Sequence, residues 1–163
     1  MQKLDWVKNK IKTRIGIEQQ CNIWRNSGYK IVFTNGCFDI LHHGHLDLLA
    51  QSADFGNKLV VGLNTDASVR TLKGPERPVT NENDRAFQLA SLLVVDGVCL
   101  FDEPTPAELI EIIKPDVLVK GGDYTIDKIV GADFVMKNGG SVEIIPFVDG
   151  YSTTSIIDRI KKL

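Results

Sequence analysis

Short apolar runs, separated by stretches with helical periodicity, constrain the fold of this chain more than any other feature of its sequence. The runs are rich in β-branched residues and lack the apolar–polar alternation of a half-exposed strand, which is typical of parallel strands buried on both faces. They fall at residues 31–33, 59–63, 98–101, 117–119 and 142–145. This alternation predicts a parallel sheet covered by helices, and right-handed crossovers make it a doubly wound, Rossmann-like α/β domain with five strands.

The stretches between and after the runs predict the helices that cover the sheet. They fall at about 43–55, 66–72, 82–93, 105–113, 126–138 and 152–162. The last of them carries Ile156, Ile160 and Leu163 on one face and two lysines near its carboxyl end, where they complement the helix dipole. We expect this body to span residues 29–163 as one domain, which suits a chain of 163 residues.

Residues 1–28 differ from the body and predict an N-terminal helical extension. Apolar residues recur at helical spacing on both sides of Gly16, which interrupts the pattern, and Gly28 ends it as a C′ glycine would. These apolar positions are Leu4, Val7, Ile11, Ile17, Cys21 and Trp24. Basic residues surround the first of them, so a helix on a membrane surface is one interpretation. We favour docking of the apolar stripe on the body or on a second subunit.

Charge and cysteine content argue against several classes of protein. Nineteen Lys and Arg residues against twenty-one Asp and Glu give a net charge of −2, which disfavours a nucleic-acid-binding protein. The three cysteines are widely spaced with no CxxC pair, so we expect neither a disulfide framework nor a zinc knuckle. No apolar run reaches membrane-spanning length, and no secretory signal is evident. We expect a cytoplasmic protein with no nucleic-acid or membrane partner.

Polar residues and glycines follow four of the five predicted strands. These segments are 34–39, 64–66, 120–124 and 149–154. Parallel strands place their carboxyl ends at one edge of the sheet, and doubly wound folds bind their ligands there. The sequence therefore predicts one ligand site built from four segments that lie far apart along the chain.

All three histidines of the chain lie within four positions, as His42, His43 and His45. At the start of a helix His42 and His45 share a face, and Gly44 between them lets a ligand approach the backbone. Free N–H groups at a helix start bind anions, so two imidazoles beside them suit a chain of phosphates. For His43, capping or packing against the sheet is the better interpretation.

Two other ligand classes fit the same segment less well. A zinc site with Asp39 or Cys37 is disfavoured, because adjacent histidines on a helix diverge and no second pair of ligands is evident. A dinucleotide site is also disfavoured, because Gly36 lacks the surrounding glycines of the GxGxxG fingerprint. A phosphate-rich ligand remains the prediction.

Two segments carry a family resemblance. Residues 38–45, Phe-Asp-Ile-Leu-His-His-Gly-His, resemble the HxGH signature of the cytidylyltransferase-like nucleotidyltransferases, and 150–155, Gly-Tyr-Ser-Thr-Thr-Ser, resemble their second signature, of the ISSTxxR type. With segments 72–78, 118–124, 130–132 and 139–140 added, the set most resembles the bacterial D-glycero-β-D-manno-heptose 1-phosphate adenylyltransferases within that superfamily. The resemblance covers about residues 29–160. Such a domain often forms the C-terminal half of a bifunctional kinase–adenylyltransferase, and here we expect it to stand alone.

The resemblance implies an enzyme that transfers AMP from ATP to a sugar 1-phosphate, D-glycero-β-D-manno-heptose 1-phosphate, giving ADP-heptose and pyrophosphate. Mg²⁺ would arrive with ATP, and protein side chains alone would hold no metal. The sugar phosphate is already an anionic nucleophile, so catalysis needs positioning and charge stabilisation rather than a general base. A homodimer is implied by resemblance only. Two alternatives stay open, a cytidylyltransferase acting on glycerol 3-phosphate or a similar alcohol phosphate, and a non-catalytic nucleotide-binding module.

The resemblance also implies roles for individual residues. Contact with the nucleotide phosphates and stabilisation of the transferring phosphoryl group would fall to His42, His45 and Lys73. The nucleotide would lie along Asn35, Gly36, Cys37, Phe38, Gly44, Gly121, Gly122, Asp123, Tyr124, Ser152, Thr153 and Thr154. The substrate-binding residues would be Asp39, Asn64, Asp66, Arg77, Arg85 and Lys120.

Some of these residues also suit a structural role. Cys37 is interpreted as a small packing residue whose backbone matters, not as a nucleophile. Arg85 suits charge balance at a helix start as well as it suits an acceptor phosphate. Thr153 and Thr154 can cap a helix, which does not exclude phosphate binding.

One position departs from the family pattern. Many members carry an arginine after the second signature or before its glycine, and here those places hold Ile157 and Phe147. Arg159 lies two residues later, on a different helix face. Lys120, Lys73 or Arg77 could supply the missing cation, and the sequence does not choose among them.

Overall fold

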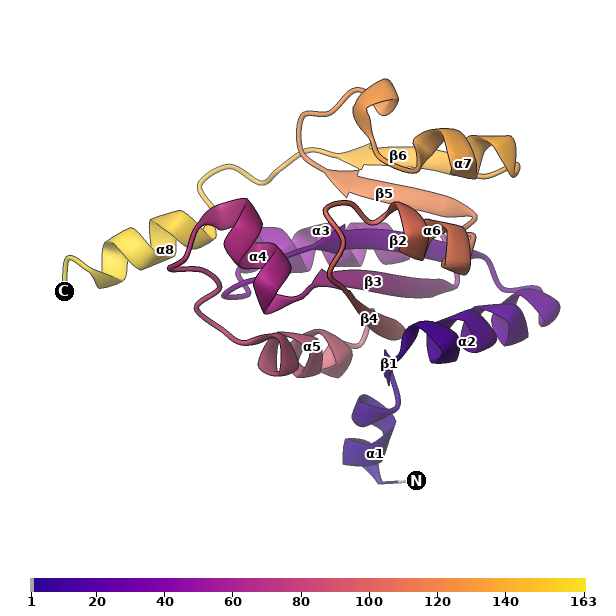
Figure 1. Ribbon diagram of the computed structural model, residues 1–163, viewed down its shortest axis with the longest axis horizontal. Coiled ribbons are helices and arrows are strands. Elements are labelled where there is room, and N and C mark those ends of the chain that lie inside the picture. The colour runs from indigo at the N-terminus through magenta and orange to yellow at the C-terminus, as the bar shows by residue number, and fades with distance from the viewer. Residues whose placement is uncertain (1) are drawn as a thin grey trace.

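The computed structural model describes residues 2–163 and shows a six-stranded sheet in the order β1-β4-β3-β2-β5-β6, with helices on both faces (Figure 1). Every neighbouring pair of strands is parallel. The strands are β1 (Ile11–Lys12), β2 (Ile31–Gly36), β3 (Lys58–Asn64), β4 (Gly97–Phe101), β5 (Val117–Gly121) and β6 (Ser141–Ile145). The helices are α1 (Lys3–Lys8), α2 (Arg14–Asn26), α3 (His43–Ala53), α4 (Asp66–Lys73), α5 (Glu82–Ser91), α6 (Ala107–Ile113), the 3₁₀ turn η1 (Ile126–Lys128), α7 (Ala132–Lys137) and α8 (Thr153–Ile160).

The predicted fold class is confirmed, but the predicted number of five strands is wrong. The sixth strand, β1, comes from the N-terminal segment and pairs with β4 at the sheet edge, with Ile11 opposite Val98. Two residues of strand leave no apolar run that a sequence pattern could reveal. The N-terminal segment is therefore not helical throughout, because β1 separates α1 from α2. Gly16 does not interrupt the second helix: it lies inside α2, and its N–H donates to the side chain of the N-cap residue Thr13.

The second helix of this segment docks on the body, as we predicted from its apolar stripe. Ile17 and Cys21 are buried in a core cluster with residues of the sheet and of α6, and Trp24 packs against that cluster. The Arg25 guanidinium also donates to the carbonyl of Ile113, at 2.8 Å. This chain itself therefore covers the stripe from Val7 to Trp24, whereas Leu4 remains exposed.

The sheet separates two apolar layers, because successive residues of a strand point to opposite faces. On one face, which we call the α6 face, the strands pack against α2, α6 and α7. On the other, the α3 face, they pack against α3 and α5. Helices α3 and α6 lie on opposite sides of the sheet in Figure 1. The chain first builds β3 and β4 on one side of β2 and then β5 and β6 on the other. The strand order thus reverses between β2 and β5, where doubly wound folds bind ligands.

Most predicted helices agree with the structure to within a few residues, and one does not. The stretch at 126–138 is split into η1 and α7, because Gly131 adopts a left-handed backbone conformation with φ of 86° just before α7 begins. Near the end of the chain, α8 projects away from the sheet (Figure 1). Among residues 2–163, no helix combines the length and apolar character that crossing a bilayer requires.

Candidate active site

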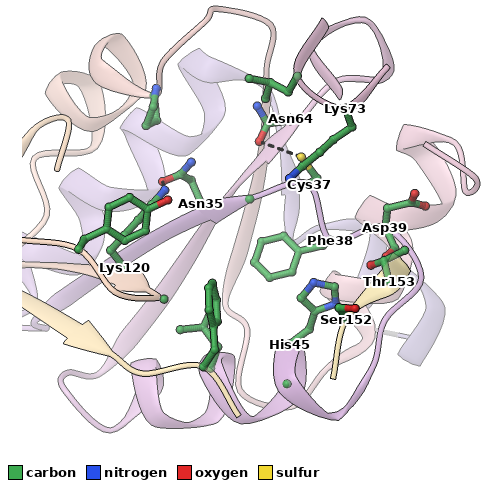
Figure 2. Close-up of a pocket in the computed structure, with 18 of the residues that line it drawn as sticks. Asn35, Cys37, Phe38, Asp39, His45, Asn64, Lys73, Lys120, Ser152 and Thr153 are labelled. Atoms are coloured by element: carbon green, nitrogen blue, oxygen red, sulfur yellow. Dashed lines mark hydrogen bonds between the residues drawn. The ribbon is translucent and has the colours of Figure 1, made fainter. Parts of the chain in front are cut away.

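A cavity of about 840 Å³ opens at the carboxyl ends of the central strands. Its floor includes Asn35 of β2, Asn64 of β3, Phe101 of β4 and Lys120 of β5, and its walls come from α3 and from the loops that precede α5 and α8. The four segments predicted to meet at one edge all contribute to this lining. The cavity lies where the strand order reverses, and Figure 2 shows some of its lining side chains.

The two signature histidines lie against each other at the start of α3. His42 is the N-cap residue, His45 lies in the first turn, and their rings stack with centroids 3.8 Å apart and an interplanar angle of 19°. The Nδ1 atom of each ring is buried and has no hydrogen-bond partner within residues 2–163. Both residues line the cavity, but these two Nδ1 atoms are shielded from it, so a ligand would contact other atoms of the rings.

The environment keeps both imidazoles neutral in the free protein. Burial lowers the pKa of His42, and burial together with the neighbouring His42 lowers the pKa of His45 to about 4. Both rings are therefore mostly uncharged near pH 7. A bound anion would supply the opposite charge and raise both pKa values, so proton uptake and phosphate binding are coupled at this pair.

His43 does not join the pair. Its side chain is exposed, and its ring contacts that of Tyr151 with centroids 4.9 Å apart. The prediction that His43 caps the helix or packs against the sheet is therefore wrong, because His42 is the N-cap and the His43 ring contacts the segment before α8.

The loop between β2 and α3 has an unusual backbone that distant elements hold in place. Phe38 and Ile40 adopt left-handed φ values of 46° and 53°, which non-glycine residues rarely do. The Arg85 guanidinium donates to the carbonyl of Cys37 at 2.6 Å, and the Thr153 hydroxyl donates to the carbonyl of Asp39 at 2.6 Å. Bonds from α5 and α8 thus fix the loop that presents the Phe38 ring to His45, at a centroid distance of 5.3 Å.

The Asp39 carboxylate, predicted to bind substrate, is committed to the protein. It is fully buried and accepts hydrogen bonds from Arg77 Nε at 2.6 Å and from the backbone N–H groups of Val79 and Thr80. Burial alone would raise the pKa of Asp39, but the bonds from Thr80, Val79 and Arg77 outweigh burial and hold it below the usual value. Asp39 therefore fastens the loop between Lys73 and α5 to the cavity floor.

Arg85 and Asp66 require a correction, because neither lines the cavity. Arg85 is completely buried, and its guanidinium donates to the carbonyls of Thr80, Cys37 and Asn64. It also pairs with the Asp66 carboxylate at 2.7 Å. Helix α5 turns this side chain inward beneath the floor, so Arg85 joins the ends of β2 and β3 and is not free to bind an acceptor phosphate.

Two lysines approach the cavity from different elements, as Figure 2 shows. Lys73, the last residue of α4, extends over the floor near Cys37. Lys120, on β5, donates to Oδ1 of Asn35 at 3.3 Å and lies 5.8 Å from the centre of the Tyr124 ring. Burial lowers the pKa of Lys120. Arg77 also lines the cavity, so all three candidates for the missing family arginine are near the site.

The Cys37 thiol has the properties of a packing residue. Burial raises its pKa, and this effect outweighs the nearby positive charges of Lys73 and Arg85. Its sulfur lies 4.0 Å from Oδ1 of Asn64. The thiol stays protonated near neutral pH, so it is poorly suited to act as a nucleophile.

The two glycine- and hydroxyl-rich segments are only partly in the cavity. Gly121, Tyr124, Ser152, Thr153 and Thr154 line it, whereas Gly122 and Asp123 do not. Asp123 is exposed, and the structure thus places it outside the predicted nucleotide contact. Ser152 caps α8 by accepting from the N–H of Ser155, and the Thr153 hydroxyl is occupied by Asp39.

The apolar part of the cavity lining was not predicted from the sequence. Its members are Leu48, Leu72, Phe101, Pro104, Pro106, Ile129, Val130 and Phe147. Phe101 could have been found, because it ends a predicted strand just as the polar site residues do. The others come from loops and helices whose distance from the site depends on the tertiary structure.

No group of three His, Cys, Asp or Glu side chains within residues 2–163 is placed to hold a metal ion. Asp39, which lines the cavity, is already satisfied by Arg77 and two N–H groups. An Mg²⁺ ion here would need the phosphate oxygens of a nucleotide as ligands, which is the usual way that Mg²⁺ binds in nucleotide sites.

A parallel α/β sheet with paired imidazoles at a helix start, beside a large cavity at the switch point, is an arrangement suited to phosphate-rich ligands. The family model described as Cytidylyltransferase-like matches residues 33–159. The chain therefore belongs to the cytidylyltransferase-like family, and it is a nucleotidyltransferase.

Individual relatives agree with this assignment. The chain is 52% identical over 152 residues to the bifunctional protein HldE of Trichlorobacter lovleyi and 58% identical over 137 residues to HldE of Paramagnetospirillum magneticum. These matches cover 93% and 84% of this chain but 31% and 28% of the relatives, so the chain spans about a third of their length.

Among solved structures, the chain resembles a lipopolysaccharide core biosynthesis protein from Thermoplasma volcanium, with a TM-score of 0.60 and 31% identity over 77% of this chain and 100% of that one. A pantoate–β-alanine ligase from Francisella tularensis has a TM-score of 0.58 at 14% identity, covering 94% of this chain and 78% of that one, which shows a shared fold alone.

Proposed function

We propose that this nucleotidyltransferase transfers AMP from ATP to D-glycero-β-D-manno-heptose 1-phosphate, producing ADP-heptose and pyrophosphate. The observation that carries the proposal is the stacked pair of His42 and His45, which lies at the start of α3 and lines the cavity. The similarity to HldE and to a lipopolysaccharide core biosynthesis protein supports a sugar phosphate as the acceptor.

The reaction needs no group on the protein to activate the acceptor. An oxygen of the sugar phosphate attacks the α-phosphorus of ATP, the bond between that phosphorus and the bridging oxygen breaks, and pyrophosphate leaves with the bond electrons. Negative charge shifts to the leaving group during this step. His42, His45 and Lys73 hold the phosphates and stabilise that charge, and the neutral imidazoles take up protons as the anion binds.

The backbone of the loop after β2 positions the nucleotide. Arg85 and Thr153 hold its carbonyls, so the loop retains its shape before any ligand arrives. Mg²⁺, carried in by ATP, neutralises phosphate charge when it is bound. The protein contributes a preorganised surface for the phosphates, which is the main source of catalysis in such reactions.

Pyrophosphate release tests the proposal. The purified chain is assayed with Mg²⁺ and either ATP or CTP, against heptose 1-phosphate, mannose 1-phosphate and glycerol 3-phosphate. We expect turnover with ATP and heptose 1-phosphate to exceed every other combination. Preferred turnover with CTP and glycerol 3-phosphate would overturn the substrates but keep the reaction type. Nucleotide binding without any pyrophosphate release across the panel would support a non-catalytic module.

A further inference from the structure

The carboxyl edge of the sheet presents a row of side chains on the α6 face, away from the histidines. Along each strand, alternate residues point to the same face. Each of the strands β2 to β5 has a residue in the core of the α6 face, and the residue two or four positions further along that strand points to the same face at the carboxyl edge. In the spatial order β4-β3-β2-β5, the row consists of Phe101, Asn64, Asn35 and Lys120. All four line the cavity, whereas α3, which carries His42 and His45, packs on the other face.

Lys120 is the charged member of this row, and its charge is not balanced by the protein. Its ammonium donates to the neutral amide of Asn35, and no carboxylate within residues 2–163 lies within salt-bridge distance of it. Arg85, by contrast, has its charge matched by Asp66. A largely buried ammonium without a counter-ion favours an anionic ligand.

Lys120 and His45 lie on different sides of the Phe38 ring (Figure 2), which is what an in-line displacement needs from the two groups that hold its acceptor and its leaving group. In such a step the attacking and leaving oxygens lie on opposite sides of the phosphorus. In Figure 2, Lys120 and Asn35 lie on one side of the Phe38 ring, and His45, Ser152 and Thr153 lie on the other. Pyrophosphate leaving toward the histidines and the start of α8 would place the acceptor on the side of Lys120.

We propose that Lys120, oriented by Asn35, binds the phosphate group of the acceptor and sets it opposite the leaving pyrophosphate. This inference rests on the proposed nucleotidyl transfer but concerns a different substrate. Phe101 closes the row on β4, and Pro106 and Ile129 also line the cavity, so the carbon skeleton of the acceptor has apolar side chains to contact. Lys120 is thus the determinant of acceptor affinity, and the histidines serve the nucleotide.

Steady-state kinetics of Lys120→Met test the assignment, with Lys137→Met as the matched control. Lys137 lies in the last turn of α7, is exposed and is not part of the cavity lining, so the control makes the same change of charge elsewhere. We expect Lys120→Met to raise KM for heptose 1-phosphate about ten- to a hundredfold, while KM for ATP changes less than about threefold. Lys120→Arg should recover part of the loss. Equal increases in both KM values, or none in either, would overturn the proposal.

Inorganic phosphate separates binding of the phosphate group from binding of sugar hydroxyls. With the nucleotide side filled by the α,β-methylene analogue of ATP, phosphate affinity is measured by calorimetry. Lys120→Met should weaken it about tenfold or more, whereas unchanged affinity would overturn the assignment.

This binding measurement does not require turnover, so it stands even if the proposed reaction fails. Should wild-type protein prefer glycerol 3-phosphate, the substrates of the proposed function fail. The Lys120 inference still holds if KM for that acceptor rises in the variant, and it is overturned if that KM does not change.

Discussion

The two sides of the cavity solve the same problem, binding a phosphate, by different physical means. On the α3 side, His42 and His45 are neutral in the free protein and have unpartnered buried nitrogens. On the α6 side, Lys120 carries an amine that is far more basic in water than an imidazole; burial lowers its pKa, and it has no carboxylate partner within residues 2–163. The first side is a pair of weak bases that gain charge when an anion arrives, and the second is a strong base whose ammonium form lacks a counter-ion until an anion binds. The difference predicts that removing each side will affect a different substrate and a different pH dependence.

The largest effect should come from the α3 side. His42→Ala and His45→Ala should each lower kcat about a hundred- to ten-thousandfold, because each removes a donor that stabilises charge developing on the phosphates. His43→Ala is the matched control, since His43 is exposed and outside the cavity lining. Its kcat should stay within about twofold of wild type. Pyrophosphate release at saturating substrates is the measurement, and wild-type kcat in either signature variant would contradict the assignment.

Among these variants, the loss of Arg85, which lies beneath the cavity floor, should reduce the stability of the fold most. Arg85→Met removes a buried guanidinium and leaves the Asp66 carboxylate and the carbonyls of Cys37, Asn64 and Thr80 without their donors. We expect the free energy of unfolding, measured with urea, to fall by about 3–5 kcal/mol. Adding Asp66→Asn should recover part of the lost unfolding free energy, because the unpaired carboxylate charge of Asp66 is then removed. A loss below about 1 kcal/mol would show that the floor does not depend on Arg85.

Proton uptake distinguishes the two sides directly. Near pH 7, pyrophosphate binding should take up protons, since the lowered pKa values of His42 and His45 rise when an anion supplies the opposite charge. Calorimetry in buffers of different ionisation enthalpy counts these protons. The His42→Ala/His45→Ala double variant should lose the uptake and Lys120→Met should keep it. An uptake that survives in the double variant would assign it to other groups.

The same pair makes stability depend on pH in a defined direction. The pKa of His45 is about 4 in the folded protein, and the ordinary value of 6.5 applies to the unfolded chain. Protonation therefore favours unfolding, so this contribution is complete above pH 6.5 and is lost as the pH falls toward 4. We expect His45→Asn to reduce the fall in unfolding free energy over this window by about 3 kcal/mol. An identical pH profile in the variant would refute the shift.

The smallest effect should come from the bond that ties α8 to the loop after β2. Thr153→Val removes the hydroxyl that donates to the carbonyl of Asp39 and leaves the shape of the side chain almost unchanged. Unfolding free energy should fall by about 1–2 kcal/mol. Because the loop would be held less firmly, kcat should fall several-fold as well. Loss of stability without any change in kcat would show that the bond does not position the loop.

The sequence was sufficient for the strand–helix alternation and for the edge at which the site lies. The apolar runs of β2 to β5 reflect burial on both faces, and the carboxyl ends of parallel strands must meet. It was not sufficient for β1, since two residues at a sheet edge have no apolar pattern of their own. Gly131 shows a similar limit, because its effect on the last crossover depends on the conformation that it adopts.

Within the site, the sequence predicted the kinds of side chain present better than it predicted the role of each residue. The histidine pair was predicted from spacing because a helix start fixes which side chains share a face. Arg85 was not, because its sequence context at the start of α5 does not reveal that the side chain turns inward to Asp66 and three carbonyls. Asp123 lies in a glycine-rich segment at a strand end, but it is exposed and does not line the cavity. A position after a strand end places a residue near the site without fixing whether its side chain faces the cavity.

The most direct test of the central claim is ³¹P NMR of the wild-type protein with ATP, Mg²⁺ and heptose 1-phosphate. The account predicts that ADP-heptose and pyrophosphate appear in equal amounts as ATP and the sugar phosphate disappear, and that the His42→Ala/His45→Ala double variant leaves the spectrum unchanged. Release of orthophosphate with ADP, or equal product formation by the double variant, would contradict nucleotidyl transfer at the histidine pair.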